Sequence, residues 1–375
     1  MKWSCAQSAF SKGLTAVGHA IKGTATQPIL GQVLVIADDG RLQLTATSLD
    51  MTITYAIEAE VDEPGQGTLP FRLASDFVHA LPAGGTVAVS IDRKHVAHIR
   101  CGRTEGNLKG LDPRDFPQVP TLETNALARV KPSLLREMIE QVVPAVAADT
   151  SRPIFTGVLT HLKTDGSARM VAADGFRLAL RDASLDEHPA EELKLLIPGR
   201  ALVEVGRNLL SDTKGDEHLV EVGLSGNKNH VVFRRANAEV ASRLLEGQFP
   251  NYEAVLPTET GSVVEIERGA LLSAVRSARV FSDRLVRLEF STGKLRVTAA
   301  SSDTGENTSE MEAAIDGEDG QISFDVRYLA DALSTVATEQ VRMEVISPGR
   351  PGIFRPTGST EALHLIMPLA EKAAG

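Results

Sequence analysis

The sequence contains little cysteine, and no long run of apolar residues occurs in its 375 positions. Cys5 and Cys101 are the only cysteines, too few for a disulfide framework or a thiolate metal site, so we expect both to be buried thiols. No segment approaches the roughly 18 consecutive apolar residues that cross a membrane. The first residues, Met1 to Cys5, lack the apolar stretch of a signal peptide. We therefore expect a cytoplasmic protein with no membrane partner.

Recognisable catalytic, metal and phosphate motifs are also lacking. No Gly-rich loop ends in Lys-Ser or Lys-Thr, so there is no P-loop. His95 and His98 are the closest histidines, but residues three apart on an expected strand point to opposite faces and do not share a metal. Asp316-Gly317-Glu318-Asp319-Gly320 resembles part of a calcium loop without its twelfth-position ligand, so an exposed acidic turn is expected. These absences favour a non-catalytic protein without metal or cofactor.

Positive charge is in deficit. The chain has 39 lysines and arginines against 49 aspartates and glutamates, which gives a formal net charge of −10. Domains that bind nucleic acid are usually basic. The net charge therefore argues against a nucleic-acid partner unless positive charge is confined to one part of the molecule.

What the sequence does contain is a threefold internal repeat. The equivalent residues Ala46, Ala172 and Ala299 follow similar apolar segments and are separated by 126 and 127 residues. A second set of landmarks keeps the same spacing: Phe71-Arg72-Leu73-Ala74, Ile197-Pro198-Gly199-Arg200 and Phe324-Asp325-Val326-Arg327. A period of this length is the size of a whole domain and exceeds that of solenoid repeats. Turn-rich connectors then predict three domains, at residues 1–125, 126–258 and 259–375.

Each repeat has the pattern helix, strands, helix, strands. Apolar spacings of three and four predict opening helices over 9–21, 133–143 and about 271–278. Alternating segments on either side of the turns at 38–40, 165–166 and 292–293 predict hairpins. Second helices are expected over 74–81, 200–210 and 327–333, followed by strands such as 86–91, 219–224 and 340–346. The third repeat is expected to end in a strand over 363–369. The fold class is therefore α+β, with two helices packed on β-sheets in each domain.

An ordered set of short motifs resembles the bacterial sliding clamps, the beta subunits of DNA polymerase III. The similarity covers essentially the whole chain, and the landmarks are Pro28-Ile29-Leu30, Ala173-Asp174-Gly175-Phe176-Arg177-Leu178, Phe249-Pro250-Asn251-Tyr252, Val255-Leu256-Pro257 and Ile366-Met367-Pro368-Leu369.

The resemblance implies a ring-shaped, head-to-tail homodimer of six domains that encircles duplex DNA without sequence preference. Such a ring is loaded by an ATP-dependent clamp loader and tethers the polymerase, with no catalysis of its own. Because encirclement needs no strong grip on phosphates, a net acidic exterior with basic helices inside is compatible with this role. The implied partners are the polymerase III alpha subunit, the clamp-loader delta subunit, and other polymerases and repair proteins that carry a short linear motif.

Basic residues on or beside the expected helices are candidates for the DNA-facing surface, although a Lys or Arg on an amphipathic helix is often only its solvated face. The candidates are Lys12, Lys22, Arg72, Arg136, Arg152, Arg200, Arg207, Arg276, Arg279 and Arg327.

The resemblance also implies a partner-peptide groove between the second and third repeats. An extended peptide with apolar side chains needs an apolar pocket, and a methionine would provide a deformable wall. In this chain Ala173 stands where many clamps carry Thr. The matching residues are Phe155, Ala173, Gly175, Phe176, Arg177, Leu178, Pro250, Val255, Ile366, Met367, Pro368 and Leu369.

For the dimer contact, the resemblance implies Val280 and Phe281 of the third repeat against Leu108 of the first repeat of another subunit. Gly106 stands where an aromatic residue is common, so a cavity or a different packing is expected there. Two alternatives remain at this stage. One is a three-domain interaction scaffold that never encircles DNA. The other is an enzyme with a site around Asp174 and His161, which would require a perturbed acid in a deep polar pocket.

Overall fold

The computed structural model describes residues 1–21, 23, 27–122, 128–211, 218–259, 261–282, 284–301 and 305–370. Over these ranges the chain is α+β, as predicted, and every paired strand is antiparallel. In the described part of the chain the α-helices are α1 (Gln7–Gly18), α2 (Phe71–Ala80), α3 (Pro132–Val142), α4 (Gly199–Leu209), α5 (Arg268–Phe281) and α6 (Val326–Thr335). Each of the six expected helices is confirmed, with ends that differ by a few residues.

Local chemistry explains where the helices begin. Glu267 lies at the N-cap of α5, where its carboxylate accepts hydrogen bonds from the backbone amides of Gly269 and Ala270. Asp325 does the same for α6 through the amide of Arg327, at 2.9 Å. The helices are held by one apolar face, as α1 shows by burying Phe10, Leu14 and Val17. No described helix combines the length and the apolar character needed to cross a bilayer.

The strands follow the same order in each repeat. The first repeat contains β1 (Lys2–Ala6), β2 (Gln32–Asp38), β3 (Arg41–Thr47), β4 (Met51–Glu58), β5 (Glu60–Glu63), β6 (Gly65–Pro70), β7 (Thr86–Ile91), β8 (Val96–Cys101) and β9 (Thr104–Lys109). The second contains β10 (Ala128–Val130), β11 (Gly157–Leu162), β12 (Ser167–Ala173), β13 (Arg177–Ser184), β14 (Leu193–Pro198), β15 (Val220–Leu224), β16 (His230–Arg235) and β17 (Ala238–Arg243). The third contains β18 (Ser262–Glu267), β19 (Leu285–Ser291), β20 (Lys294–Ser301), β21 (Gly305–Asp316), β22 (Gly320–Asp325), β23 (Gln340–Val345), β24 (Gly352–Pro356) and β25 (Ala362–Ile366).

The predicted hairpins are confirmed in all three repeats, as β2–β3, β11–β12 and β19–β20. Two local predictions were wrong. The last strand ends at Ile366 because Pro368 cannot donate a backbone hydrogen bond to a ladder. His95 is not on a strand but in the turn before β8, with a positive φ of 61°.

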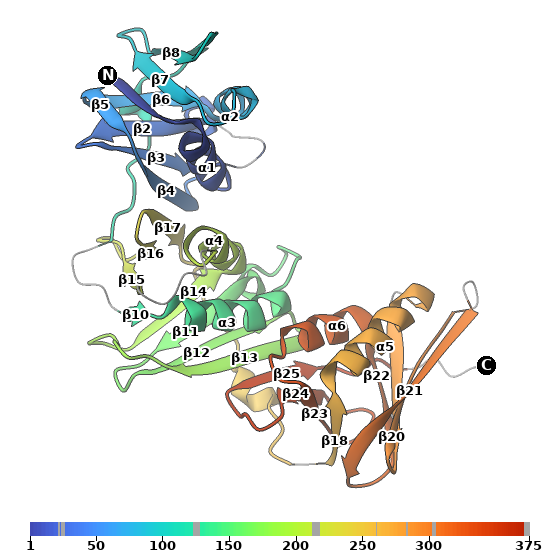
Figure 1. Ribbon diagram of the computed structural model, residues 1–375. Coiled ribbons are helices and arrows are strands. Elements are labelled where there is room, and N and C mark those ends of the chain that lie inside the picture. Colours follow the sequence, from blue (N-terminus) through green and yellow to red (C-terminus); the bar gives the residue numbers. More distant parts are fainter. Residues whose placement is uncertain are drawn as a thin grey trace. The chain divides into compact units, whose positions relative to one another are not determined.

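Contacts divide the chain into two compact units, and the division passes through the second repeat (Figure 1). Unit 1 is Met1–Ser133 with Arg200–Leu244, and unit 2 is Leu134–Gly199 with Leu245–Gly375. Unit 1 contains a five-stranded sheet, β5-β1-β7-β8-β9, and an eight-stranded sheet, β10-β15-β16-β17-β4-β3-β2-β6. Unit 2 contains a twelve-stranded series, β14-β11-β12-β13-β25-β24-β23-β18-β21-β20-β19-β22.

Pairs of strands join neighbouring repeats inside each unit. In unit 1, β4 of the first repeat pairs with β17 of the second, with Ile53 opposite Val240. In unit 2, β13 of the second repeat pairs with β25 of the third, with Ala179 opposite His364. The long strand β21 pairs with β20 through residues 305–312 and with β18 through 313–316. Backbone hydrogen bonds therefore connect successive repeats.

Apolar side chains fill the space between the helices and the sheets. In unit 1, the Trp3 and Phe10 rings pack edge to face with centroids 5.1 Å apart. In unit 2, α5 and α6 cover a core that includes Phe324 and Phe354, whose centroids are 5.5 Å apart. Both cysteines are buried as expected, and burial raises the pKa of the Cys5 thiol to about 12.

Candidate functional site

One face of the unit 2 sheet carries an apolar cluster that spans the second and third repeats. Its buried members are Val171 and Ala173 on β12, Leu178 and Leu180 on β13, Ile353 on β24, and Leu363 and Leu365 on β25. Phe155, Leu159, Phe249, Tyr252 and Leu256 cover this cluster in part. The rings of Phe155, Phe249 and Tyr252 meet edge to face, with centroids 6.3 and 6.4 Å apart. The strand pair β13–β25 therefore creates one apolar surface from two repeats.

Exposed apolar side chains border this cluster. Phe176, Val255 and Met367 are 56%, 53% and 41% exposed, and they are half of the exposed large hydrophobic residues in the described part of the chain. Phe176 directly precedes β13, and its carbonyl accepts a 2.8 Å hydrogen bond from the Met367 amide. Apolar groups left in water at the edge of an apolar cluster are typical of a site that binds another molecule. We use the name apolar groove for the surface formed by this cluster, the three exposed side chains and the other predicted groove residues.

The turn between β12 and β13 fixes the direction of Phe176. Asp174 accepts hydrogen bonds from the amides of Phe176 and Arg177, at 2.9 and 3.0 Å, and from Arg177 Nε at 3.0 Å. Gly175 adopts a φ of 94°, and a Cβ at this position would lie 3.0 Å from the Arg152 guanidinium. A side chain at residue 175 would therefore both strain the turn and displace Arg152.

The arginines at the groove are held by several partners. Arg152 lies over the Phe155 ring at 4.8 Å and donates to the Asp174 carbonyl at 2.8 Å. Arg177 lies over the Tyr328 ring at 4.3 Å and contacts Asp331 at 2.7 Å. These contacts place Arg152, a predicted DNA-facing residue, beside the groove residues.

A buried histidine, His364, lies near Arg177. Burial, and then the charge of Arg177, lower the pKa of His364 to about 4, and His364 Nε2 is 2.9 Å from Thr335 Oγ1. His364 therefore stays uncharged at neutral pH and adds no second positive charge below Arg177.

The remaining predicted groove residues do not all face this surface. Ala173 and Leu178 are buried in the apolar cluster and Pro250 is exposed, whereas Ile366 is buried in the core under α5 and α6, on the other face of the sheet. After β25, the Leu369 amide donates to the Ser323 carbonyl at 2.8 Å, so the segment around Pro368 is attached on both sides. All twelve predicted groove residues lie in unit 2, on or beside the strands that form this surface.

The predicted DNA-facing residues have different environments. Arg276 and Arg279 are exposed on α5, and no ion pair is recorded for them within the described residues. Arg207 and Arg327 form ion pairs with Glu204 and Asp325, at 2.9 Å each. The other contacts are Lys12 over the Tyr55 ring at 5.9 Å, Arg72 to the Gly23 carbonyl at 3.2 Å and Arg200 to the His19 carbonyl at 3.4 Å. Arg136 is partly exposed on α3, and Lys22 lies outside the described residues.

The predicted dimer residues are exposed to different degrees. Val280 is 74% exposed at the end of α5, whereas Phe281 packs partly against the core. Leu108 is partly exposed on β9, the last strand of its sheet. A Cβ at Gly106 would meet the Phe77 ring at 2.6 Å, so this ring occupies the space beside the glycine. Phe77 was not predicted, because its position on α2 opposite a glycine is a tertiary contact without a local sequence pattern.

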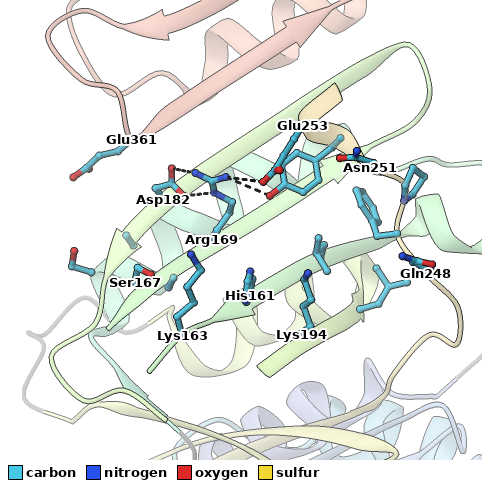
Figure 2. Close-up of a pocket in the computed structure, with 18 of the residues that line it drawn as sticks. His161, Lys163, Ser167, Arg169, Asp182, Lys194, Gln248, Asn251, Glu253 and Glu361 are labelled. Atoms are coloured by element: carbon cyan, nitrogen blue, oxygen red, sulfur yellow. Dashed lines mark hydrogen bonds and ion pairs between the residues drawn. The ribbon is translucent and has the colours of Figure 1, made fainter. Parts of the chain in front are cut away.

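A polar hollow of about 890 Å³ lies on the same sheet face as the apolar cluster (Figure 2). It includes His161, which pairs with Glu192, but not Asp174. His161 is opposite Arg169 on β12, and Asp174 follows that strand five residues later, about 16 Å further along. The two residues of the enzymatic alternative therefore do not form one site. The described residues include no group of three or more His, Cys, Asp or Glu that could hold a metal.

Comparisons with known proteins agree with this arrangement along the full chain. The N-terminal, central and C-terminal domain families of the DNA polymerase III beta subunit match residues 1–120, 129–251 and 253–370. The beta sliding clamp of Synechocystis sp. is 32% identical, with 98% of this chain and 99% of the relative covered. The Bacillus subtilis clamp is 28% identical over 98% and 99% of the two chains.

Solved structures give the same result. The crystal structure of the Bacillus subtilis sliding clamp has a TM-score of 0.92 at 27% identity and covers 99% of this chain and 100% of its own. A Pseudomonas aeruginosa clamp bound to griselimycin has a TM-score of 0.90 at 26% identity, with the same coverage.

The fold and these relatives define the class as the sliding clamps, which are non-catalytic processivity proteins. Within that class, the chain belongs to the DNA polymerase III beta subunit family. Its function is that of a processivity factor of DNA polymerase III, and the enzymatic alternative is rejected.

The Gly175 turn can be tested by substitution. Gly175→Ala should lower the free energy of unfolding by about 1–2 kcal/mol, because a Cβ at positive φ is strained and meets Arg152. Urea denaturation monitored by circular dichroism measures the change. The control is Gly349→Ala, where no atom lies within 4 Å of the added Cβ and a loss below about 0.5 kcal/mol is expected. Equal losses in both variants would contradict the strain argument.

Proposed function

We propose that two copies of the chain form a head-to-tail ring that encircles duplex DNA in the cytoplasm and tethers the polymerase to it. The observation that carries the proposal is that two strands, β9 and β21, each leave one edge without a partner strand in the described chain. Within the described chain, β9 pairs only with β8, and residues 305–312 of β21 pair only with β20. Unpaired strand edges are templates for another strand.

The repeat identifies which edges belong together. The hairpin sets β2–β3–β4, β11–β12–β13 and β19–β20–β21 are equivalent, and so are β7–β8–β9, β15–β16–β17 and β23–β24–β25. The third strand of one set pairs with the last strand of the next repeat, as β4–β17 and β13–β25 show. By the same rule, β21 requires a partner strand equivalent to β17 and β25. The equivalent strand of the first repeat is β9, so β9 of a second copy would pair with β21. Two such contacts close a dimer.

Side chains at these edges support the pairing. Leu108 lies on β9, Phe77 covers Gly106 of the same strand, and Val280 and Phe281 lie at the end of α5. We propose that Phe77 supplies from the helix the aromatic group that the strand lacks. Apolar groups from both subunits would then meet beside the β9–β21 pair.

The helices would form the inner surface of the ring. Twelve helices with axes about 8–10 Å apart give a circumference of about 110 Å and, after the helix radii are subtracted, a hole of about 25 Å. Hydrated duplex DNA fits such a hole. We propose that the exposed Arg276 and Arg279 contact phosphates, together with the other basic candidates on the helices, and that Arg152 belongs to the groove wall. Loose, sequence-independent contacts allow sliding.

The apolar groove would hold short apolar motifs of the polymerase III alpha subunit, the clamp-loader delta subunit and repair proteins. A structural relative from Pseudomonas aeruginosa has been solved with griselimycin bound, so clamps of this fold accept a ligand. A tethered polymerase that releases the primer end remains nearby at high effective concentration and rebinds. The domain boundaries 1–125, 126–258 and 259–375 are part of this proposal.

Exchange of the aromatic group tests the dimer contact. Phe77→Ala should weaken dimerisation at least tenfold, because aromatic residues often dominate interfaces. The double variant Phe77→Ala/Gly106→Phe should recover much of the affinity, since the ring moves from α2 to β9. Sedimentation velocity over a dilution series measures both, and Leu49→Ala, which truncates an exposed apolar residue on the β3–β4 turn, is the control. An unchanged dimer in Phe77→Ala would refute the assignment.

Substitution at the end of β25 tests the groove. Met367→Ala/Pro368→Ala should abolish binding of the alpha subunit and leave the dimer intact, because the change removes a groove wall and no predicted subunit contact. Surface plasmon resonance measures binding, and sedimentation measures the dimer. Undiminished affinity would show that partners bind elsewhere.

Retention on DNA tests the ring itself. Labelled protein loaded onto nicked circular DNA by its cognate loader should remain bound through gel filtration and be lost after the circle is cut. The expected loss follows from a topological link, since a ring slides off free ends. Retention on linear DNA with unblocked ends would mean ordinary affinity and would overturn the proposal.

A further inference from the structure

One segment of the chain lies between the polar hollow and the apolar groove. We call this segment, residues 247–255, the strap. Its residues 247–253 line the hollow. Phe249 and Tyr252 of the strap pack on the apolar cluster, and Val255 at its end is 53% exposed at the groove. The strap is therefore a wall that separates the two features.

The strap has little polar attachment to the sheet. Before it, the Leu245 amide donates to the Leu196 carbonyl at 2.9 Å. After it, the Leu256 amide donates to Glu253 of the strap itself, at 3.2 Å. Between these points no backbone hydrogen bond to a strand is recorded for residues 247–255, all of which the structure describes. Apolar packing is non-directional, so the few directional contacts of the strap decide its position.

Arg169 on β12 makes these directional contacts. It donates to the Tyr252 hydroxyl at 3.4 Å, and its Nη1 is 3.9 Å from the Glu253 carboxylate. Asp182, opposite Arg169 on β13, fixes the guanidinium through contacts of 2.6 Å at Nε and 2.8 Å at Nη2. These hydrogen bonds raise the pKa of Arg169 and orient its plane. Figure 2 shows Arg169 joined by dashed lines to Asp182 on one side and Glu253 on the other.

The internal repeat shows that contact with a strap is particular to this position. The residues equivalent to Arg169 are Gln43 in the first repeat and Arg296 in the third. Gln43 lies opposite Ala56, which offers no side-chain partner. Arg296 binds Glu310 across the strands at 2.7 Å, and its recorded partners in the described chain all lie on strands. The cross-strand pair alone is therefore separable from contact with an overlying segment.

The charges around the hollow balance one another. Its cations are Lys163, Arg169 and Lys194, and its carboxylates are Asp182, Glu253 and Glu361. Equal numbers of opposite charges give a charged ligand no net attraction. The polar side chains of the hollow thus act on the strap that closes one side of it.

We propose that Arg169 is a positioning residue for the apolar groove, because it holds the strap that forms one groove wall. This inference rests on the proposed function of the groove. Tyr252 is the first residue of the 3₁₀-helix Tyr252–Val255, and Val255 is the last. A contact that fixes the start of this single turn also fixes the direction in which Val255 points. A wall that is ordered before a ligand arrives spares the complex the cost of ordering it.

Surface plasmon resonance with the polymerase III alpha subunit tests the inference. Arg169→Met should weaken binding about three- to tenfold, because the strap is no longer held. Tyr252→Phe removes only the hydroxyl, keeps the packed ring and should weaken binding about twofold. The double variant Arg169→Met/Tyr252→Phe should bind no more weakly than Arg169→Met, since both changes remove one contact. Full affinity in Arg169→Met would overturn the inference.

A truncated wall separates positioning from a general loss of stability. In a Val255→Ala background, Arg169→Met should cause a clearly smaller loss of affinity than in the wild-type chain, because the side chain that it positions is already shortened. Equal losses in the two backgrounds would show that Arg169 does not act through Val255 and would overturn the inference. The matched control is Arg296→Met, which removes the equivalent cross-strand pair where no strap contact is recorded and should leave binding unchanged.

Hydrogen exchange followed by mass spectrometry gives a readout that does not depend on a partner. In Arg169→Met the amides of residues 248–256 should exchange faster than in the wild-type chain, whereas those of β12 and β13 should stay as protected. Unchanged exchange in the strap would overturn the inference. Faster exchange throughout β12 and β13 would make Arg169 a residue that stabilises the sheet and would also overturn it.

Failure of the groove itself would give a different pattern. If Met367→Ala/Pro368→Ala leaves alpha-subunit binding intact, partners bind elsewhere and both the proposed groove and this inference fall. If that variant abolishes binding while Arg169→Met binds normally, the groove stands and only the positioning role of Arg169 is refuted.

Discussion

The arrangement of the repeats depends on one interaction, which is the backbone pairing of strands from successive repeats. In the first and second repeats, the outer strand of one hairpin set pairs with the last strand of the following repeat, as β4–β17 and β13–β25 do. This pairing explains why the compact units cut through the second repeat and do not follow the repeat boundaries. The same pairing, applied to the edges left at β21 and β9, is the basis of the proposed assembly with a second copy.

Function follows from what that pairing creates. Because β13 and β25 come from different repeats, their alternate residues combine into an apolar cluster that neither repeat could form alone. The Asp174 turn directs Phe176 outward, and the segment after β25 brings Met367 beside it. The proposed binding surface is thus formed by the junction of two repeats, and its integrity is coupled to the stability of the sheet.

Local patterns in the sequence predicted the fold class, the six helices and the hairpins, because amphipathic spacing and turn residues act within a few positions. The groove residues could be proposed only through a family resemblance, since they come from separate segments. The end of β25 was missed because the apolar pattern continues past Ile366 while Pro368 cannot pair. The position of Phe77 beside Gly106 could not be predicted, because it depends on tertiary packing between α2 and β9.

The burial of both cysteines has a practical consequence. Thiolates are the reactive species, and burial keeps the Cys5 thiol protonated with a pKa of about 12. Cys101 is equally shielded, at 2% exposure. A cysteine introduced at an exposed position would therefore be the fast-reacting thiol of the native protein. Dyes or crosslinkers could be attached there without first removing the natural cysteines, so that the proposed subunit contact could be followed in a chain of otherwise natural sequence.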